Sequence, residues 1–313
     1  MADVKKIATR DSYGKALVEL GREHENVVVL DADLANATKT GVFQKEFPDR
    51  HFDCGIAEAN MMCVAAGLST TGLVPFASSF AMFASGRAFE QVRNSIGYPH
   101  LNVKIGATHG GISVGEDGAS HQCCEDFALM RSIPGMVVIC PADDVEARAA
   151  VKAAYEYEGP VYLRFGRLAV PVFHEEEGYT FQIGKGEVLR DGADVAILAT
   201  GLMVYEALQA AEALEAEGIR PMVVNLPTVK PLDEELVLAA AAKCGKVITC
   251  EEHSVIGGLG EAVCGLLSER LPTPVRRIGV NDEFGHSGPA VPLLKQFGLS
   301  AEHITEVARD FCK

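Results

Sequence analysis

The sequence predicts an α/β protein built from two doubly wound, mainly parallel sheets. Short apolar runs rich in β-branched residues alternate with longer segments of helical spacing along most of the chain. The short runs are apolar throughout rather than alternating, as expected for strands with both faces covered. The length of 313 residues is sufficient for two domains, each with its own hydrophobic core.

The first half of the chain contains five predicted strands, at residues 27–30, 74–77, 103–107, 136–139 and 161–164. Between Glu58 and Leu68, apolar residues recur at helical spacing. Another helix is predicted to begin at Asp143, because the spacing of Asp143 and Glu146 is typical of a capping box. These alternating elements predict a first domain over residues 1–169.

A second domain is predicted over residues 188–313, after an acidic linker at 170–187 that has no helical period. Its predicted strands lie at 194–200, 221–225, 246–250 and 275–280, with helical segments between them. This half has few residues that indicate chemistry. We expect His253 and His286 to be structural or to lie at an interface.

Composition and charge argue against several classes of function. The net charge of −15 argues against a general nucleic-acid binder, since phosphate backbones require surplus Lys and Arg. MADVKK lacks the apolar core of a signal peptide, and no run reaches transmembrane length. Nine cysteines without a CxxC pair fit a reducing cytoplasm. Cys123 and Cys124 lie beside His121 and could be metal ligands. Because the sequence has no second Cys/His cluster at suitable spacing, we favour the alternative that they are buried or inert thiols.

Residues 106–126, GATHGGISVGEDGASHQCCED, concentrate polar groups and glycines after a predicted strand. The glycines at 110, 111, 115 and 118 predict a folded loop. In it, four side chains could converge at the carboxyl end of a strand, where open α/β sheets bind ligands: His109, Glu116, Asp117 and His121. The alternative is a solvated loop. A hydrolase based on Ser120 is disfavoured because the chain has no G-x-S-x-G elbow.

Two further segments have a structural and a functional interpretation. Glu58 falls in the first turn of a predicted helix, where a carboxylate interacts favourably with the helix dipole. If it were instead buried among apolar residues, it could share a proton with a ring nitrogen. Phe80 and Phe83 could be core residues, or they could stack on a heterocycle.

The order of these segments resembles the C-terminal half of transketolase over essentially the entire chain. The matching pieces are Ala8-Thr9-Arg10, Asp31-Ala32-Asp33-Leu34, Gly55-Ile56-Ala57-Glu58, 75–83, Ala107-Thr108-His109, VGEDGASHQ at 114–122, Arg131-Ser132-Ile133-Pro134 and Pro141-Ala142-Asp143. The GEDG-x-x-HQ run together with the upstream GI-x-E is highly specific. 1-Deoxyxylulose-5-phosphate synthase and 2-oxo-acid dehydrogenase beta subunits share the domain plan but fit this run less well.

The resemblance implies a pyrimidine-binding domain, a transketolase C-terminal domain and thiamine diphosphate as cofactor. Glu58 would hold a proton against the aminopyrimidine ring nitrogen, and His121 would lie near the reacting carbonyl. By the same resemblance, the cofactor is contacted by Phe80, Phe83 and Asp33, and the sugar phosphate by Asp117, His109, Arg10 and Arg164.

Several positions depart from the family pattern. Gly86 stands where a third aromatic of the pyrimidine pocket is expected, and Ala37 where larger relatives have a phosphate-binding serine. Ala119 and Cys123 replace prolines around the His motif.

The GDG motif and downstream Asn that hold Mg²⁺ or another divalent ion in thiamine enzymes do not occur in the sequence. The resemblance therefore implies the C-terminal subunit of a split transketolase. An N-terminal subunit would supply the diphosphate and metal site, and the pyrimidine domains would associate with each other in a heterotetramer. The alternatives are a subunit of another thiamine-dependent enzyme, or a non-catalytic partner subunit.

Overall fold

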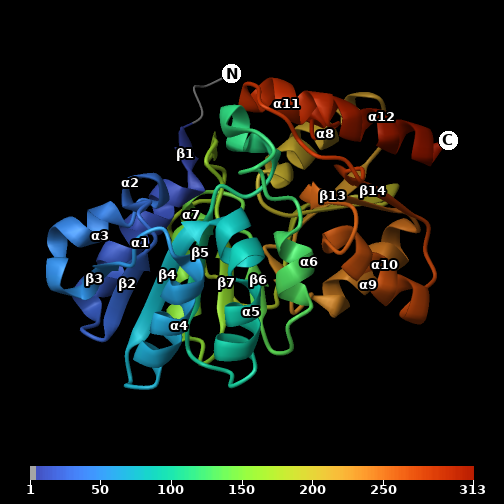
Figure 1. Cartoon of the computed structure of the whole chain (residues 1–313). Coiled ribbons are helices and arrows are strands. Elements are labelled where there is room, and N and C mark those ends of the chain that lie inside the picture. The colour runs from blue at the N-terminus through green and yellow to red at the C-terminus, as the bar shows by residue number, and fades with distance from the viewer. Residues whose placement is uncertain (1–4) are drawn as a thin grey trace.

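The computed structural model describes residues 5–313 and has the predicted α/β architecture. Two helix-covered sheets lie side by side, one formed mostly by the first half of the chain and one by the second (Figure 1). A short antiparallel pair, β1 (Lys6–Ala8) with β8 (Ala169–Pro171), joins the start of the described chain to the end of the first domain.

The first sheet has seven strands in the order β12-β6-β7-β5-β4-β2-β3. Their bounds are β12 Thr228–Lys230, β6 Val137–Ile139, β7 Val161–Arg164, β5 Lys104–Thr108, β4 Val74–Phe80, β2 Val27–Asp31 and β3 His51–Asp53. All neighbours are parallel except β12, which pairs antiparallel with β6. In the register, Asp31 lies opposite both Asp53 and Ser78, and Phe80 lies opposite Thr108. The carboxyl ends of four strands therefore meet at one edge.

The second sheet has five strands in the order β14-β13-β10-β11-β9. Their bounds are β14 Val275–Val280, β13 Val247–Ser254, β10 Val195–Ala199, β11 Pro221–Asn225 and β9 Glu187–Arg190. Only β9, at the sheet edge, is antiparallel among the described strands of this sheet.

Helices cover both sheets, and most follow a strand, as a doubly wound fold requires. The α-helices are α1 Thr9–Glu23, α2 Ala35–Thr38, α3 Gly41–Glu46, α4 Glu58–Ser69, α5 Phe89–Gln91, α6 Asp126–Arg131, α7 Asp144–Glu156, α8 Met203–Ala216, α9 Glu234–Cys244, α10 Leu259–Arg270, α11 Ala290–Gln296 and α12 Ala301–Cys312. Two 3₁₀ helices, Pro48–Arg50 and Ile112–Asp117, and two π-helices, Met82–Arg87 and Val92–Gly97, complete the set. The predicted cap is confirmed: an Asp143 carboxylate oxygen accepts from the Glu146 amide at 3.0 Å.

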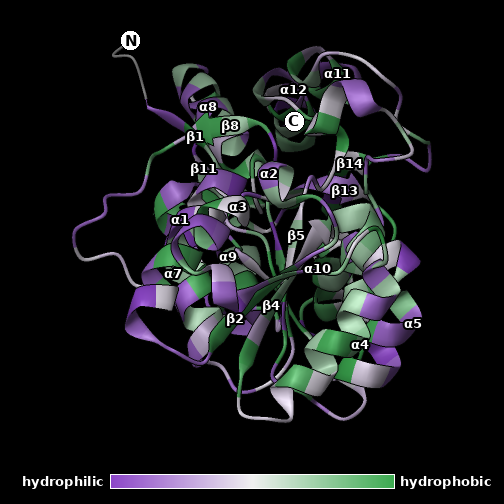
Figure 2. Ribbon diagram, turned by 60° about the vertical axis from the view of Figure 1, so that its left-hand side comes forward, coloured by the Kyte–Doolittle hydropathy of each residue, from purple (hydrophilic) through white to green (hydrophobic). Residues whose placement is uncertain are grey.

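The strands form the hydrophobic interior of each domain, seen as green segments in the middle of Figure 2. Tyr13, Phe76, Phe127 and Tyr162 are among the largest side chains buried completely. No helix in residues 5–313 is both long enough and apolar enough to cross a lipid bilayer.

Five short strands, β1, β3, β8, β9 and β12, were not predicted, and each depends on a partner distant in sequence. β12 (Thr228–Lys230) comes from the second half of the chain but extends the first sheet. β3 is only three residues long, and β9 pairs antiparallel with β11. The predicted linker at 170–187 begins inside β8 and ends at the first residue of β9. The division into domains at these residues stays a prediction.

Candidate functional site

Two aromatic and two histidine side chains predicted to carry chemistry meet at the carboxyl edge of the first sheet. Phe80 is the last residue of β4, and His109 directly follows β5 in a left-handed conformation (φ 59°). Their rings stack with centroids 3.8 Å apart. Phe83 stacks on Phe80 at 5.8 Å, and His121 lies edge-on to Phe83 at 5.2 Å. The parallel sheet explains this convergence because it aligns the ends of neighbouring strands.

The predicted cofactor acid, Glu58, is buried at the first residue of α4, with 1% of its surface exposed. The Arg87 guanidinium binds both of its carboxylate oxygens, with Nη1 at 2.9 and 3.0 Å. The same guanidinium lies over the Phe83 ring, 4.5 Å from its centroid. A cation thus links the buried acid to the aromatic group.

Arg87 reaches this position from the π-helix Met82–Arg87. A π-turn contains one residue more than an α-turn and often marks functional sites. Gly86, where a third aromatic was expected, lies in this turn, and a Cβ there would stand 2.2 Å from Met82 Cε. In the structure the exposed side of Phe83 is covered by the guanidinium of Arg87 instead.

Positive charges gather at the opposite end of the aromatic group. Arg10, the second residue of α1, donates from Nη1 to the His109 ring at 3.0 Å and to the Ala37 carbonyl at 3.2 Å. Lys39 and Arg167 lie close enough to influence the charge on His109. Arg167 is held by Glu116 and by the Val114 carbonyl. This cluster of Arg10, Lys39 and Arg167, here called the cation cluster, has the composition of an anion-binding site.

His109 is neutral in this environment. Burial, followed by the charges of Arg10 and Arg167, lowers its pKa to about 3. Because a guanidinium can only donate hydrogen bonds, His109 Nε2 must accept from Arg10. The ring proton then lies on Nδ1, which donates to the Thr108 hydroxyl at 2.8 Å. His109 is therefore an oriented neutral ring near neutral pH and is not a cation there.

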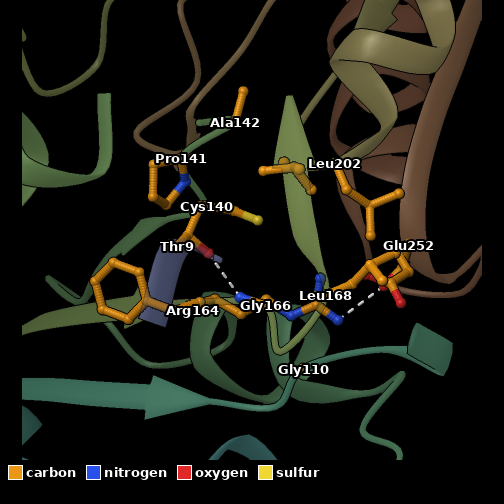
Figure 3. Close-up of a pocket in the computed structure, with 13 residues that line it drawn as sticks. Thr9, Gly110, Cys140, Pro141, Ala142, Arg164, Gly166, Leu168, Leu202 and Glu252 are labelled. Atoms are coloured by element: carbon orange, nitrogen blue, oxygen red, sulfur yellow. Dashed lines mark hydrogen bonds between the residues drawn. The ribbon is translucent and has the colours of Figure 1, made fainter. Parts of the chain in front are cut away.

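The structure places Arg164, the other predicted phosphate ligand, away from this cluster. Its side chain is 4% exposed, and its Nε lies 3.0 Å from an Asp126 carboxylate oxygen. Its Nη2 donates to the Glu252 carbonyl at 2.8 Å and to the Cys123 carbonyl at 3.2 Å. Figure 3 shows the guanidinium directed toward Glu252, across a small cavity between the domains. Arg164 thus joins the two domains.

Asp33 and Asp117 lie at the same edge of the sheet but are exposed. Asp33 adopts a left-handed conformation (φ 60°) in the turn after β2, where its amide donates to Asp53. Asp117 ends the 3₁₀ helix Ile112–Asp117, and His121 follows it in the next turn. The structure thus shows Asp117 exposed at the end of this segment, and its role as a ligand stays a prediction.

Sequence reasoning missed Arg87, Lys39 and Arg167. A usable signal existed for Arg167, which follows β7 in the run Arg164-Phe165-Gly166-Arg167, as expected for a residue beyond a strand at the ligand-binding edge. No comparable signal identified Arg87, because its partner Glu58 lies 29 residues earlier.

Two family models match this chain. The transketolase pyrimidine-binding domain matches residues 5–172, and the transketolase C-terminal domain matches residues 184–304.

Several relatives extend over almost the whole chain. A Methanocaldococcus jannaschii protein, provisionally assigned as a transketolase C-terminal section, is 53% identical over 299 residues, covering 95% of this chain and 94% of its own. A subunit of a 6-deoxy-6-sulfo-D-fructose transketolase from Clostridium sp. (strain MSTE9) is 46% identical, with coverage of 96% and 93%. Human transketolase is 38% identical over 97% of this chain, which spans only 49% of the human protein.

Among solved structures, a split-gene transketolase described as an inactive beta4 tetramer superposes with a TM-score of 0.91. It is 56% identical, and the match covers 97% of this chain and 98% of that one. Full-length transketolase from Campylobacter jejuni superposes with a TM-score of 0.84 at 25% identity, over 98% of this chain and 47% of its own. This chain belongs to the transketolase family and carries its pyrimidine-binding and C-terminal domains.

Proposed function

We propose that this chain is the C-terminal subunit of a two-chain, thiamine-diphosphate-dependent transketolase that transfers a two-carbon ketol unit from a ketose phosphate to an aldose phosphate. One observation carries the proposal. An unbroken series of contacts runs from a buried acid through stacked aromatic rings to a cation cluster. Its members, in order, are Glu58, Arg87, Phe83, Phe80, His109 and Arg10.

The residues at one end of this series suit the aminopyrimidine of thiamine diphosphate. Glu58 offers a buried carboxyl group to a ring nitrogen, and Phe83 would offer a ring face once the Arg87 guanidinium leaves it, with Phe80 packed beside it. When bound, the cofactor would supply the electron sink that protein side chains lack. Arg87 Nη1 contacts both Glu58 oxygens, and the remaining lone pairs of the carboxylate are those with which Glu58 would exchange a proton with the ring.

The residues at the other end suit the substrate. The cation cluster would hold the phosphate, a task to which guanidinium geometry is suited. The serine that is absent at Ala37 is offset by Arg167, which sequence reasoning had not included. His109, neutral and fixed by Thr108, and His121, against Phe83, would orient the sugar between the phosphate and the cofactor. We propose that Asp117 binds a sugar hydroxyl and that Asp33 contacts the cofactor.

We assign the divalent ion and the diphosphate to an N-terminal subunit. Within residues 5–313, no group of three or more His, Cys, Asp and Glu side chains is arranged to hold a metal ion. We propose that a second chain completes each active site.

Self-association through the first domain is also part of the proposal. Ile56 is 76% exposed, and Phe52 and Val64 are exposed on either side of Glu58. Helix α4 is apolar on most of its surface, drawn mainly green in Figure 2. A helix that is apolar all round is normally buried, so we infer a contact between two copies here, consistent with the tetramer of the split-gene relative.

The substrate is the open part of the proposal. Relatives are described as subunits acting on 6-deoxy-6-sulfo-D-fructose and on apulose 4-phosphate. A cation cluster can bind either a sulfonate or a phosphate, so a different anionic ketose is the second candidate. We place the enzyme in the cytoplasm because all nine cysteines, which lie within the described residues, are free thiols.

The test is reconstitution. The chain is mixed with an N-terminal subunit bearing the GDG and Asn motif, thiamine diphosphate and Mg²⁺, and assayed with xylulose 5-phosphate and ribose 5-phosphate. We expect turnover by the mixture and none by either chain alone. Turnover only with a sulfonated ketose would favour the second candidate. Activity of the mixture that is independent of thiamine diphosphate would refute the proposal.

A further inference from the structure

The second domain supports the loop that carries Asp117 and His121. This loop, residues 110–123, is here called the site loop. Its glycines touch the second domain directly. A Cβ on Gly111 would lie 2.3 Å from Glu252 Cδ, and one on Gly118 would lie 2.5 Å from Ser287 Oγ. Both glycines also have positive φ angles. The backbone of the loop therefore packs against the second domain without intervening side chains.

Glu252 makes the central contact. Its side chain is on β13, is 3% exposed, and accepts from the Ser113 amide at 2.6 Å. Ser113 is the second residue of the 3₁₀ helix Ile112–Asp117, whose first amides have no partner within the helix. The carboxylate thus satisfies a buried donor in the first turn of this segment, which kinks at Gly115 before it reaches Asp117.

Gln122 closes the other end of the site loop. Its Nε2 donates to the carbonyls of Ile112 (3.2 Å) and Gly115 (3.3 Å) within the loop. It also donates to the His286 carbonyl of the second domain at 3.0 Å. Since His121 is the neighbouring residue, its backbone lies next to the same anchor, while its ring contacts Ser120 and Phe83.

We infer that Glu252 is a positioning residue: its carboxylate, acting through the Ser113 amide, fixes the site loop and so sets where Asp117 and His121 stand. The second domain then contributes to sugar binding without touching the sugar. The catalytic consequence rests on the proposed function, whereas the anchoring of the loop is a property of the chain alone.

The adjacent residue provides a matched control. Glu251 is as deeply buried, but strand alternation directs it to the opposite face of the sheet. Its two oxygens accept from the Leu259 and Gly260 amides at 2.7 and 2.8 Å, at the start of α10 in its own domain. Glu251 has the same chemistry and similar burial to Glu252 but supports the start of α10 instead of the site loop.

The experiment compares Glu252→Met, Glu252→Gln and Glu251→Met. Amide hydrogen exchange of residues 110–123 is measured on the isolated chain, with the unfolding temperature of each variant. Donor KM and kcat are measured on the reconstituted enzyme. We expect Glu252→Met to speed exchange in the site loop about 10- to 100-fold, the loss of one hydrogen bond to a charged group. Donor KM should rise in a similar range.

The other variants separate positioning from general stability. Glu252→Gln retains an acceptor for the Ser113 amide. Its site loop should keep most of its protection from amide exchange, and its donor KM should stay close to that of the unsubstituted enzyme. Glu251→Met should lower the unfolding temperature and speed exchange near 259–262, leaving the site loop protected. If Glu252→Met does not fold, Glu252→Asp is used in its place. This substitution shortens the side chain by one methylene, and we expect it to speed exchange in the site loop and raise the donor KM in the same way.

Two results would overturn the anchoring of the site loop. One is a site loop that keeps its protection in the Glu252 variants. The other is a site loop that loses protection equally in the Glu251 variant. Because exchange is measured without turnover, failure of the proposed function would leave the anchoring result standing, and a normal KM with a loosened loop would reject the positioning role.

Discussion

The two sheets of this protein have the same kind of topology but use their carboxyl edges differently. The carboxyl edge of the first sheet carries Glu58, Phe80 and His109, and the cation cluster lies beyond the strands. Asp117 is exposed at this edge. At the second sheet, the polar groups at the strand ends are bound to the first domain. Their contacts are Thr200 to the Cys140 carbonyl, Asn225 to Glu146 and Glu252 to Ser113.

This difference shows that a doubly wound sheet provides a ligand-binding edge only where no neighbour covers it. The second sheet buries its edge against the first domain, and the first sheet leaves part of its edge exposed, where we propose that the chemistry takes place. Substitutions at the two edges should therefore change different quantities, activity at the first and stability at the second.

The largest effect is expected from Glu58→Gln at the first edge. Glutamine still accepts a hydrogen bond from Arg87 but cannot take up or release a proton. We expect kcat of the reconstituted enzyme to fall about 10²- to 10⁴-fold, the range of a lost acid-base group, with little change in unfolding free energy. Glu90→Gln, on the exposed face of α5, is the control. Steady-state kinetics that show full activity would support a non-catalytic subunit.

Arg164→Met tests the second edge. It leaves Asp126 as an uncompensated buried charge, which typically costs about 3–5 kcal/mol. We expect urea unfolding to show a loss of this size in the free energy of unfolding. Amide hydrogen exchange should also be faster where the domains meet. A variant of normal stability whose KM for the sugar phosphate is raised would restore Arg164 as the phosphate ligand that the family resemblance suggested.

Arg167→Met separates the two arginines at the end of the same strand. Removing a charge-assisted contact to the phosphate should raise KM about 10- to 100-fold. The side chain is 35% exposed, so we expect a change of less than about 1 kcal/mol in unfolding free energy. Measuring kcat and KM with phosphorylated and unphosphorylated donors would show whether the effect belongs to the phosphate. An equal effect on both donors would contradict the assignment.

The smallest effect concerns the pH dependence of stability. Burial lowers the folded-state pKa of His109 to about 3, below the ordinary histidine value of 6.5. The unfolded chain therefore binds a proton that the folded chain does not, and stability should fall as pH decreases from about 6.5 toward 3. His109→Asn should reduce this slope by at most ~1.4 kcal/mol per pH unit.

Urea unfolding of both proteins between pH 4 and 7 checks the difference. Glu251, whose pKa burial raises to about 7, acts with the opposite sign, because its stabilising proton is lost as pH rises through that value. It is present in both proteins and cancels in the comparison. Parallel pH profiles would show that His109 is not buried as the structure has it.

Much of the site could be predicted because its residues lie next to recognisable strand and helix ends. Phe80 ends β4, His109 follows β5 and Glu58 begins α4, so a parallel sheet brings them near one another. Arg87 could not be predicted, since an inserted π-turn sets its direction. The choice between Arg164 and Arg167 also lay outside local patterns, because it depends on Asp126 being buried beside β7.

The sequence by itself determined the alternation of strands and helices, the family and most of the residues that carry chemistry, because hydrophobic periodicity and motifs are local properties. Only the tertiary structure decided which sheet edge stays open, which arginine lies near His109 and which acid contacts the site loop. Each of those outcomes depends on partners far apart in the chain, such as Ser113 with Glu252, whose burial together fixes the charge and hydrogen bonding of both.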